Sequence, residues 1–372
     1  MAQNSKLNFM VFYLWNAGVT ASHDQQFNTT FAWDVDLLAG YAYEFVPNTA
    51  VRPGTDRFGG LKNPTLHRQL NAWRPEAILL FGYNYHTHVH LVFWSRFKRI
   101  PLLFRGDSHL LGRTKLSLAK KLSLHLLFRQ FKAFLCTGVA NRAYFQNLGI
   151  PESKLFMAPH SVNAAHFVPT SDLCAQAKDL RQSLGVDPET RVILFAGKFV
   201  PAKQPAELLQ AFLDLKPDRT ALVFVGDGEE KTRLQRMAAS APSGTVHFLP
   251  FANQSEMPAR YLMADIFVLP SRGLYETWGL AVNEAMHMGV PCIVSDRVGC
   301  QQDLVTEGET GWTFAVNDPI GLHNALERGL AADRAALKPH IARRIGQYTY
   351  KQTTEGLLAA LAATRLGSHS NP

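Results

Sequence analysis

Two glutamates in the second half of the chain, Glu276 and Glu284, are separated by a segment that could hold an anionic ligand. Residues 271–285 (SRGLYETWGLAVNEA) follow a predicted buried strand and open a predicted helix. The first N–H groups of such a helix lack intrahelical acceptors and form an anion site that suits a diphosphate. These donors belong to Gly279, Leu280 and Ala281. The two carboxylates suit hydroxyl groups of a sugar or ribose, although a capped helix with two solvated glutamates gives the same pattern.

Two lysines follow another predicted strand. Gly197 and Lys198 come directly after the strand expected at 192–196, and Lys203 lies in the same loop. Two cations in one such loop can neutralise a leaving diphosphate, where electrostatic stabilisation is large. Either lysine alone would more often be a solvated surface residue. Their occurrence together with the helix-start anion site favours the ligand-binding interpretation.

The elements that must position these residues alternate between strand and helix in the second half, which predicts a parallel sheet covered by helices on both faces. Strands are expected at 192–196, 221–225, 246–249, 266–269 and 291–295, and helices at 206–215, 229–239, 257–263 and 279–288. The first half is less regular, with strands expected at 9–14, 77–81, 101–105 and 133–137. We therefore predict an α/β fold with two Rossmann-like domains facing each other across a cleft. Ligands in such sheets bind beyond the carboxyl ends of the strands.

A chain of 372 residues exceeds the usual size of a single core. We expect an N-terminal domain over residues 1–168 and a C-terminal domain over 169–345, with a linker near 164–172 where small, polar and proline residues collect. A last helix at 346–366 is expected to pack back on the first domain.

The net charge of +8 is concentrated in the first half. Residues 1–168 contain 18 Lys and Arg against 8 Asp and Glu, whereas residues 169–372 contain 20 against 22. Residues 110–134 mix Leu and Phe with cations and could lie on an anionic membrane as an amphipathic element. A solvated helix face near a phosphate-rich acceptor explains the same charges. Nucleic acid is not expected, because no binding motif accompanies the basic surface.

The four cysteines lack C-x-x-C spacing and are interpreted as small buried residues in a reducing compartment. They are Cys136, Cys174, Cys292 and Cys300. No run approaches the roughly 18 apolar residues of a membrane span, and the N-terminus does not have the pattern of a signal peptide. We expect a cytoplasmic protein whose contact with the inner face of the membrane, if any, is peripheral.

Several motifs recur in order and resemble the retaining family 4 glycosyltransferases (glycosyl transferases group 1) of GT-B fold. They are the 197–203 loop, Val225-Gly226-Asp227-Gly228, Glu276-x7-Glu284, the 289–295 segment and the glycines at 308 and 311. The resemblance spans nearly all of residues 190–315 and continues more weakly at 158–167. There, Ser161 and Asn163 replace the family's usual Gly and Asp.

The resemblance implies a hexosyltransferase that retains anomeric configuration and uses a nucleotide sugar, with UDP as the default base and GDP open. Glu276 would contact the donor sugar, Glu284 the ribose, and residues 279–281 the phosphates. Lys198 and Lys203 would meet the charge that develops on the leaving group. The resemblance implies neither a cofactor nor a metal.

A histidine of the first domain approaches the sugar in this family, and His109, after the strand at 101–105, is the matching catalytic candidate. Gly197 and Gly226 are further donor-binding candidates. Gly18 is another, although the family often has a Gly-Gly pair where this chain has Asn-Ala-Gly.

The first domain is expected to hold the acceptor, which would be a sugar, a lipid-linked molecule or a small molecule in glycan or polysaccharide biosynthesis. The acceptor-side candidates are Arg105, Asp107, Tyr83 and Trp33. Tyr83 lies in an aromatic segment that could stack on a ligand or be an ordinary loop. The Asp34-x-Asp36 pattern imitates the D-x-D metal motif, but that motif belongs to another architecture, so we expect no metal site.

Two other functions remain open at this point. A GT-B nucleotide-sugar 2-epimerase shares the scaffold and needs no acceptor. A non-catalytic sugar-nucleotide-binding subunit would bind the donor without turnover, although the presence of both glutamates and both lysines weighs against it.

Overall fold

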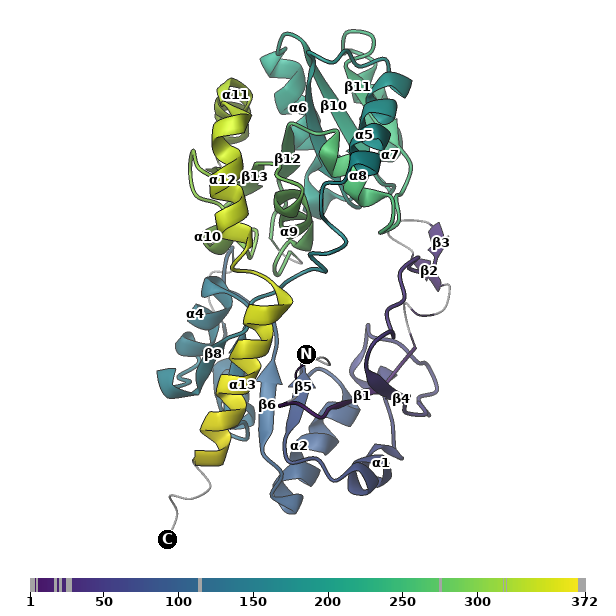
Figure 1. Ribbon diagram of the computed structural model, residues 1–372. Helices are drawn as coiled ribbons and strands as arrows, with labels where there is room; N and C mark the ends of the chain where they lie inside the picture. The colour runs from purple at the N-terminus through teal and green to yellow at the C-terminus, as the bar shows by residue number, and fades with distance from the viewer. Residues whose placement is uncertain are drawn as a thin grey trace.

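The computed structural model describes residues 4, 6–16, 19, 22–24, 29–112, 116–273, 276–316, 318 and 320–366. It contains two α/β domains (Figure 1), which confirms the predicted fold class. The N-terminal domain comprises β1 to β8 with the last helix, α13, and the C-terminal domain comprises α5 to α12.

A parallel sheet forms the centre of the C-terminal domain, with strand order β11-β10-β9-β12-β13-β14. Its strands are β9 (Arg191–Ala196), β10 (Thr220–Val225), β11 (Val246–Leu249), β12 (Ile266–Leu269), β13 (Cys292–Ser295) and β14 (Gly311–Phe314). The inner strands are runs of fully buried apolar residues, as expected where helices cover both faces of a sheet. The strand order reverses between β9 and β12, so the loops after these two strands diverge and leave room for a ligand.

The helices of the C-terminal domain connect these strands. They are α5 (Ser171–Ser183), η3 (Pro201–Lys203), α6 (Pro205–Leu215), α7 (Lys231–Ala238), α8 (Met257–Leu262), α9 (Leu280–His287), α10 (Gln301–Leu304), α11 (Gly321–Ala331) and α12 (Arg334–Ile345). The Thr170 side chain accepts a hydrogen bond from the Leu173 backbone N–H and caps α5. The expected linker at 164–172 is therefore too long, because its last two residues belong to this helix.

The N-terminal domain has a parallel sheet of order β5-β6-β7-β8, a parallel pair β1-β4 and an antiparallel pair β2-β3. The strands are β1 (Met10–Tyr13), β2 (Ser22–Asp24), β3 (Thr29–Phe31), β4 (Ala42–Phe45), β5 (Ile78–Phe81), β6 (Leu102–Arg105), β7 (Ala133–Cys136) and β8 (Leu155–Met157). The helices are η1 (Phe58–Gly60), α1 (Leu66–Trp73), α2 (His86–Lys98), α3 (Leu118–Phe128), α4 (Val139–Asn147) and η2 (Glu152–Lys154). Buried aromatic rings of β6, α3, β7 and α4 pack on one another in its core.

The last helix, α13 (Tyr350–Leu366), returns from the C-terminal domain and packs on β7 and β8 (Figure 1). Gly356 allows this close packing, because a Cβ at this position would lie 2.0 Å from the backbone oxygen of Met157. The Thr353 hydroxyl donates a hydrogen bond of 2.7 Å to the Pro159 backbone oxygen. The chain therefore crosses between the domains twice.

Two further observations bear on the sequence predictions. Cys174, in α5, is exposed, so the expectation that all four cysteines are buried is wrong for this residue. Among the described helices, none combines the length and the apolar character needed to cross a membrane.

Candidate active site

The loops after β9 and β12 meet at the point where the strand order reverses. The backbone oxygen of Ala202, in η3, accepts hydrogen bonds from the Ser271 hydroxyl at 3.1 Å and the Arg272 backbone N–H at 2.8 Å. Lys203 ends η3, and its Nζ forms an ion pair with the Glu276 carboxylate. The side chains are only 25% and 10% exposed, so the sheet topology places a largely buried pair of opposite charges here.

His109 reaches this pair from the N-terminal domain. Its Nδ1 accepts a hydrogen bond of 3.1 Å from the Leu111 backbone N–H, which leaves the ring proton of the neutral imidazole on Nε2. Nε2 lies 3.3 Å from the Glu276 backbone oxygen and donates to it. The ring is buried, and its orientation is therefore fixed by contacts from both domains.

Asp107 makes a second contact between the same two loops. The Thr277 hydroxyl donates a hydrogen bond of 2.6 Å to the Asp107 carboxylate. The loop after β6 is thus bound to the segment that carries Glu276. The structure therefore brings the predicted residues Glu276, Lys203, His109 and Asp107 together.

The helix start predicted at Gly279 is present, because α9 begins at Leu280 with Gly279 at its N-cap. Gly279 has a φ of +101°, and a Cβ there would lie 3.0 Å from a methyl carbon of Val298 and 3.1 Å from one of Leu269. A glycine is the residue that adopts this conformation in such a confined space without strain. At this helix start Leu280 is exposed and Ala281 is partly exposed, whereas Gly279 is buried.

Glu284 lies within α9 and is held by other side chains of the C-terminal domain. The Tyr261 hydroxyl donates a hydrogen bond of 2.8 Å to its Oε2, and the Gln254 side chain bonds the same carboxylate. Burial raises the pKa of Glu284 above its ordinary value, although these two hydrogen bonds act in the opposite direction. These two hydrogen bonds therefore fix the orientation of the Glu284 carboxylate.

Gly197 and Gly226 pack backbone to backbone at the ends of β9 and β10. A Cβ on Gly226 would lie 2.0 Å from the Gly197 backbone oxygen. The Phe199 backbone N–H donates to the Asp227 backbone oxygen at 2.8 Å. These contacts hold the loop that carries Lys198 and Lys203. Gly18, the other donor-binding candidate, lies outside the described residues.

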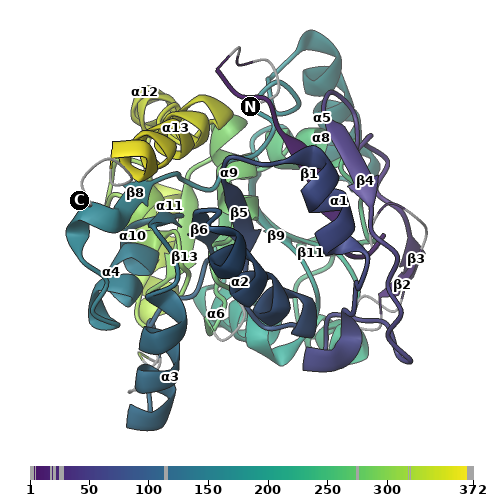
Figure 2. The same ribbon diagram turned by 90° about the horizontal axis from the view of Figure 1, so that it is seen from below.

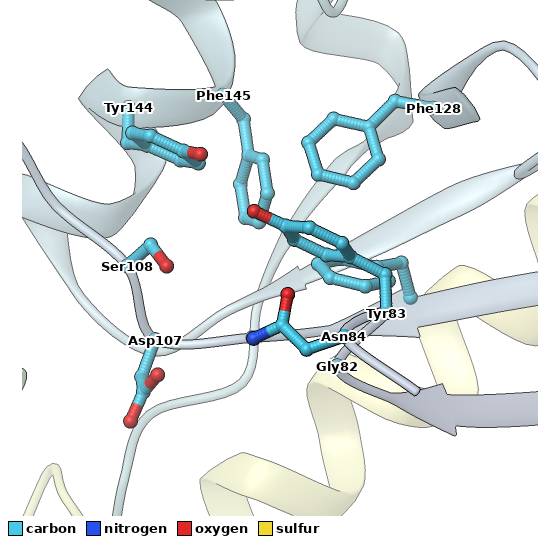
Figure 3. Close-up of a pocket in the computed structure, with 10 residues that line it drawn as sticks. Gly82, Tyr83, Asn84, Asp107, Ser108, Phe128, Tyr144 and Phe145 are labelled. Atoms are coloured by element: carbon cyan, nitrogen blue, oxygen red, sulfur yellow. The ribbon is translucent and has the colours of Figure 1, made fainter. Parts of the chain in front are cut away.

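The remaining acceptor-side candidates occupy different places. Arg105 is buried at the end of β6, where its Nη1 donates a 2.7 Å hydrogen bond to the Ala158 backbone oxygen and burial lowers its pKa to about 10. Tyr83 and Asp107 line a cavity of about 80 Å³ (Figure 3). Its wall combines aromatic rings with polar groups. The other lining residues are Gly82, Asn84, Phe104, Gly106, Ser108, Phe128, Tyr144 and Phe145.

The segment around Trp33 lies against the C-terminal domain. The Asp34 carboxylate accepts hydrogen bonds from the backbone N–H and the hydroxyl of Ser255, and the Asn253 side chain donates to the Ala32 backbone oxygen at 2.8 Å. The Asp34 carboxylate is therefore hydrogen-bonded to the hydroxyl and the backbone N–H of Ser255. Among the described residues, no group of three or more His, Cys, Asp or Glu side chains is placed to hold a metal ion.

Sequence reasoning missed other polar contacts that support the site. The Trp278 indole N–H donates to the Asn283 side-chain oxygen at 2.7 Å, and the Asn283 amide donates to the His160 backbone oxygen at 3.3 Å. Asp303 of α10 accepts a hydrogen bond from the backbone N–H of Val139, the first residue of α4. Asn283 is a fully buried polar residue in α9, and a polar side chain at a buried position needs a hydrogen-bond partner, which could have signalled such a role.

Residues 176–352 match the family described as Glycosyl transferases group 1. A D-inositol 3-phosphate glycosyltransferase from Geodermatophilus obscurus is 28% identical to this chain, over 60% of this chain and 50% of its own length. A GDP-mannose-dependent alpha-(1-6)-phosphatidylinositol monomannoside mannosyltransferase from Mycolicibacterium smegmatis is 32% identical, over 55% and 54% respectively. The chain spans about half the length of these curated relatives.

Solved structures share the fold over both domains. The crystal structure of Anabaena HepE in complex with UDP and glucose has a TM-score of 0.65 and 18% identity, with 87% of each chain covered. A glycosyltransferase from Rickettsia africae has a TM-score of 0.68 and 13% identity, covering 87% of this chain and 85% of its own. Over residues 176–352 the chain is therefore similar to the glycosyl transferases group 1 family, and its two domains have the GT-B fold.

Proposed function

We propose that this protein is a retaining glycosyltransferase of hexosyl type, which transfers a sugar from a nucleoside diphosphate sugar to a hydroxyl acceptor. The observation that carries this proposal is the Lys203–Glu276 ion pair where the strand order reverses. It lies just before the start of α9, and His109 of the other domain contacts the backbone of Glu276. This arrangement offers anion-binding, hydroxyl-binding and cationic groups together.

The donor is proposed to bind along the C-terminal domain. Its diphosphate would lie at the start of α9, where N–H groups and the helix dipole favour negative charge. Glu284, oriented by Tyr261, would accept hydrogen bonds from the ribose hydroxyls. Glu276 would hold the sugar ring, and Lys203 would contact both Glu276 and the diphosphate.

Transfer is proposed to occur on one face of the sugar. The bond between the anomeric carbon and the diphosphate oxygen breaks, and the acceptor oxygen forms its bond to the same carbon from the same face. The acceptor proton passes to the departing phosphate oxygen. Lys198, Lys203 and the start of α9 stabilise the charge that develops on the leaving group, so the reaction is proposed to need neither a metal nor a cofactor.

The acceptor is proposed to enter from the N-terminal domain, beside Asp107 and the aromatic cavity of Figure 3. The matched relatives are named for inositol-containing acceptors. Polyols and their phosphates are therefore the first acceptors to test. UDP is proposed as the donor base on the family resemblance, and GDP stays open because one matched relative is named as GDP-mannose-dependent.

The proposal is tested by incubating the protein with UDP-sugars and GDP-sugars, each with and without a panel of hydroxyl acceptors. The wild type should form a glycoside whose anomeric configuration, read by NMR, equals that of the donor, and chelation of metals should not change the rate. Glu276→Gln should lower turnover at saturating donor by about a hundredfold or more, whereas the exposed Glu207→Gln should not.

Several outcomes would contradict the proposal. Unchanged turnover of Glu276→Gln would remove the role of this residue. Conversion of the UDP-sugar to its epimer without acceptor would favour an epimerase, and donor binding without product across all acceptors would favour a non-catalytic subunit.

A further inference from the structure

The α3 helix has an unusual outer face. Leu118, Leu122 and Leu126 are 85%, 61% and 54% exposed. Their four-residue spacing places them within about 80° of one another around the helix axis and along about 12 Å of its length. Leu124 and Phe128 of the same helix are buried on the opposite side. The helix is therefore apolar on two faces, and the hydrophobic core of the domain accounts for only one of them.

Basic residues accompany this leucine stripe. Arg129 lies one turn beyond Leu126 on the same side of the helix, and Lys121 borders the stripe. Between residues 77 and 151 the chain has eleven Lys and Arg but only one acidic residue, Asp107. Asp107 is bonded to Thr277 in the other domain. The partly exposed Lys121 and the exposed Arg129 therefore flank the stripe.

A neighbouring helix repeats the pattern. The α2 and α3 helices connect successive neighbouring strands of one parallel sheet, so right-handed crossovers place them on the same face of that sheet. On α2, Phe93 and Phe97 are 68% and 81% exposed. Arg96, Lys98 and Arg99 at the end of the helix are also exposed. The apolar and basic surface therefore extends beyond one helix.

The position of α3 leaves this face accessible. Figure 2 shows α3 projecting beyond the outline of the rest of the chain. A projecting helix offers its exposed leucines and flanking cations to any surface that faces it. Such a face is complementary to an anionic bilayer, which accepts apolar side chains between its acyl chains and attracts cations to its headgroups.

We propose that the outer face of α3, together with the exposed phenylalanines of α2, binds this protein peripherally to anionic lipid membranes. The leucines insert at the boundary between headgroups and acyl chains, and Lys121 and Arg129 bind lipid phosphates. Phe128, on the inner face of α3, lines the cavity of Figure 3, so this cavity lies on the side of the helix away from the leucines. Membrane binding is independent of the proposed glycosyl transfer and can be tested without it.

Flotation with vesicles tests this proposal. The wild type should float with phosphatidylglycerol-containing vesicles and much less with pure phosphatidylcholine vesicles, and high salt should weaken the binding. The triple variant Leu118→Gln, Leu122→Gln, Leu126→Gln keeps good helix formers and should lower the partition coefficient at least tenfold. The control Val51→Gln, Ile320→Gln replaces exposed apolar residues elsewhere and should leave it unchanged.

Charge is tested separately. Lys121→Glu with Arg129→Glu should lower partition by at least tenfold, because each cation near an anionic surface contributes about fivefold. Lys178→Glu with Lys338→Glu, two exposed cations of the C-terminal domain, should have little effect.

The proposal is overturned if the wild type does not float with anionic vesicles or if the leucine variant floats equally well. It is also overturned if light scattering shows a dimer that the leucine variant dissociates, because a second copy then covers the stripe.

Discussion

Asp303 joins the two domains through a buried carboxylate, and its protonation should affect stability. Its two oxygens lie 3.2 and 3.0 Å from the Val139 backbone nitrogen, which donates to them, and the Tyr348 hydroxyl donates to Oδ1 at 3.2 Å. Burial raises the pKa of Asp303 to about 6, although these hydrogen bonds act in the opposite direction. The contact therefore costs free energy when the carboxylate is charged.

The size and sign of this cost follow from the two pKa values. An aspartate in the unfolded chain has a pKa of 3.8, so the difference of about two units corresponds to about 3 kcal/mol of stability. Below pH 4 both states carry the proton. Between pH 4 and pH 6 the folded state keeps a proton that the unfolded state releases, so stability falls as pH rises. Above pH 6 the full cost is present.

The substitution Asp303→Asn should remove this dependence, because the amide is neutral at every pH and can still accept from the Val139 N–H. The stability of the variant relative to the wild type should therefore increase by about 3 kcal/mol between pH 4 and pH 7. Urea unfolding followed by circular dichroism at several pH values measures this difference. Asp187→Asn, at an exposed position, is the control. A difference between Asp303→Asn and wild type that stays constant across this range would refute the reasoning.

Three other predictions concern local packing. Gly226→Ala should have a free energy of unfolding in urea about 1 kcal/mol or more below that of Gly244→Ala. Both glycines have positive φ, but only a Cβ at Gly226 meets a backbone oxygen, at 2.0 Å. Of the two variants, only Gly226→Ala should weaken nucleotide-sugar binding. Asn283→Ala should lower the free energy of unfolding by about 1–3 kcal/mol in the same assay, because the buried Trp278 indole N–H loses its acceptor. A thiol reagent should label Cys174 in the folded protein and all four cysteines after denaturation; rapid labelling of a second thiol in the folded state would contradict the structure.

The sequence predicted the second domain better than the first for a physical reason. Strands such as β12 are covered on both faces, so the sequence marks them as continuous apolar runs with polar residues at their ends. The predicted bounds at 246–249 and 266–269 agree with β11 and β12. In the first domain, the strand expected at 9–14 is present as β1, but its partner β4, which lies beyond the β2-β3 hairpin in sequence, was not predicted. An exposed strand such as β4 lacks that continuous apolar signal.

The site could be predicted only up to its loops. The sequence indicates that Lys203 and Glu276 each follow a strand, and parallel strands bring such loops to one edge of a sheet. It does not show that β9 and β12 are neighbours, which is what places these two side chains in contact. The contacts of Asp107 with Thr277 and of Asp34 with Ser255 are single polar pairs between distant segments, so no periodic pattern could reveal them.

The contacts between domains link the proposed donor site to the relative position of the domains. The bonds from His109 to Glu276 and from Thr277 to Asp107 cross from one domain to the other beside the proposed donor sugar. Each hydrogen bond contributes about 1 kcal/mol to a folded protein, so the pair is weak compared with the binding free energy of a typical ligand. A donor that binds more tightly to one relative position of the two domains would increase the population of that position. A donor that binds all positions equally would leave the populations unchanged. Loss of either bond should therefore change the affinity for donor even though neither Asp107 nor His109 belongs to the C-terminal domain.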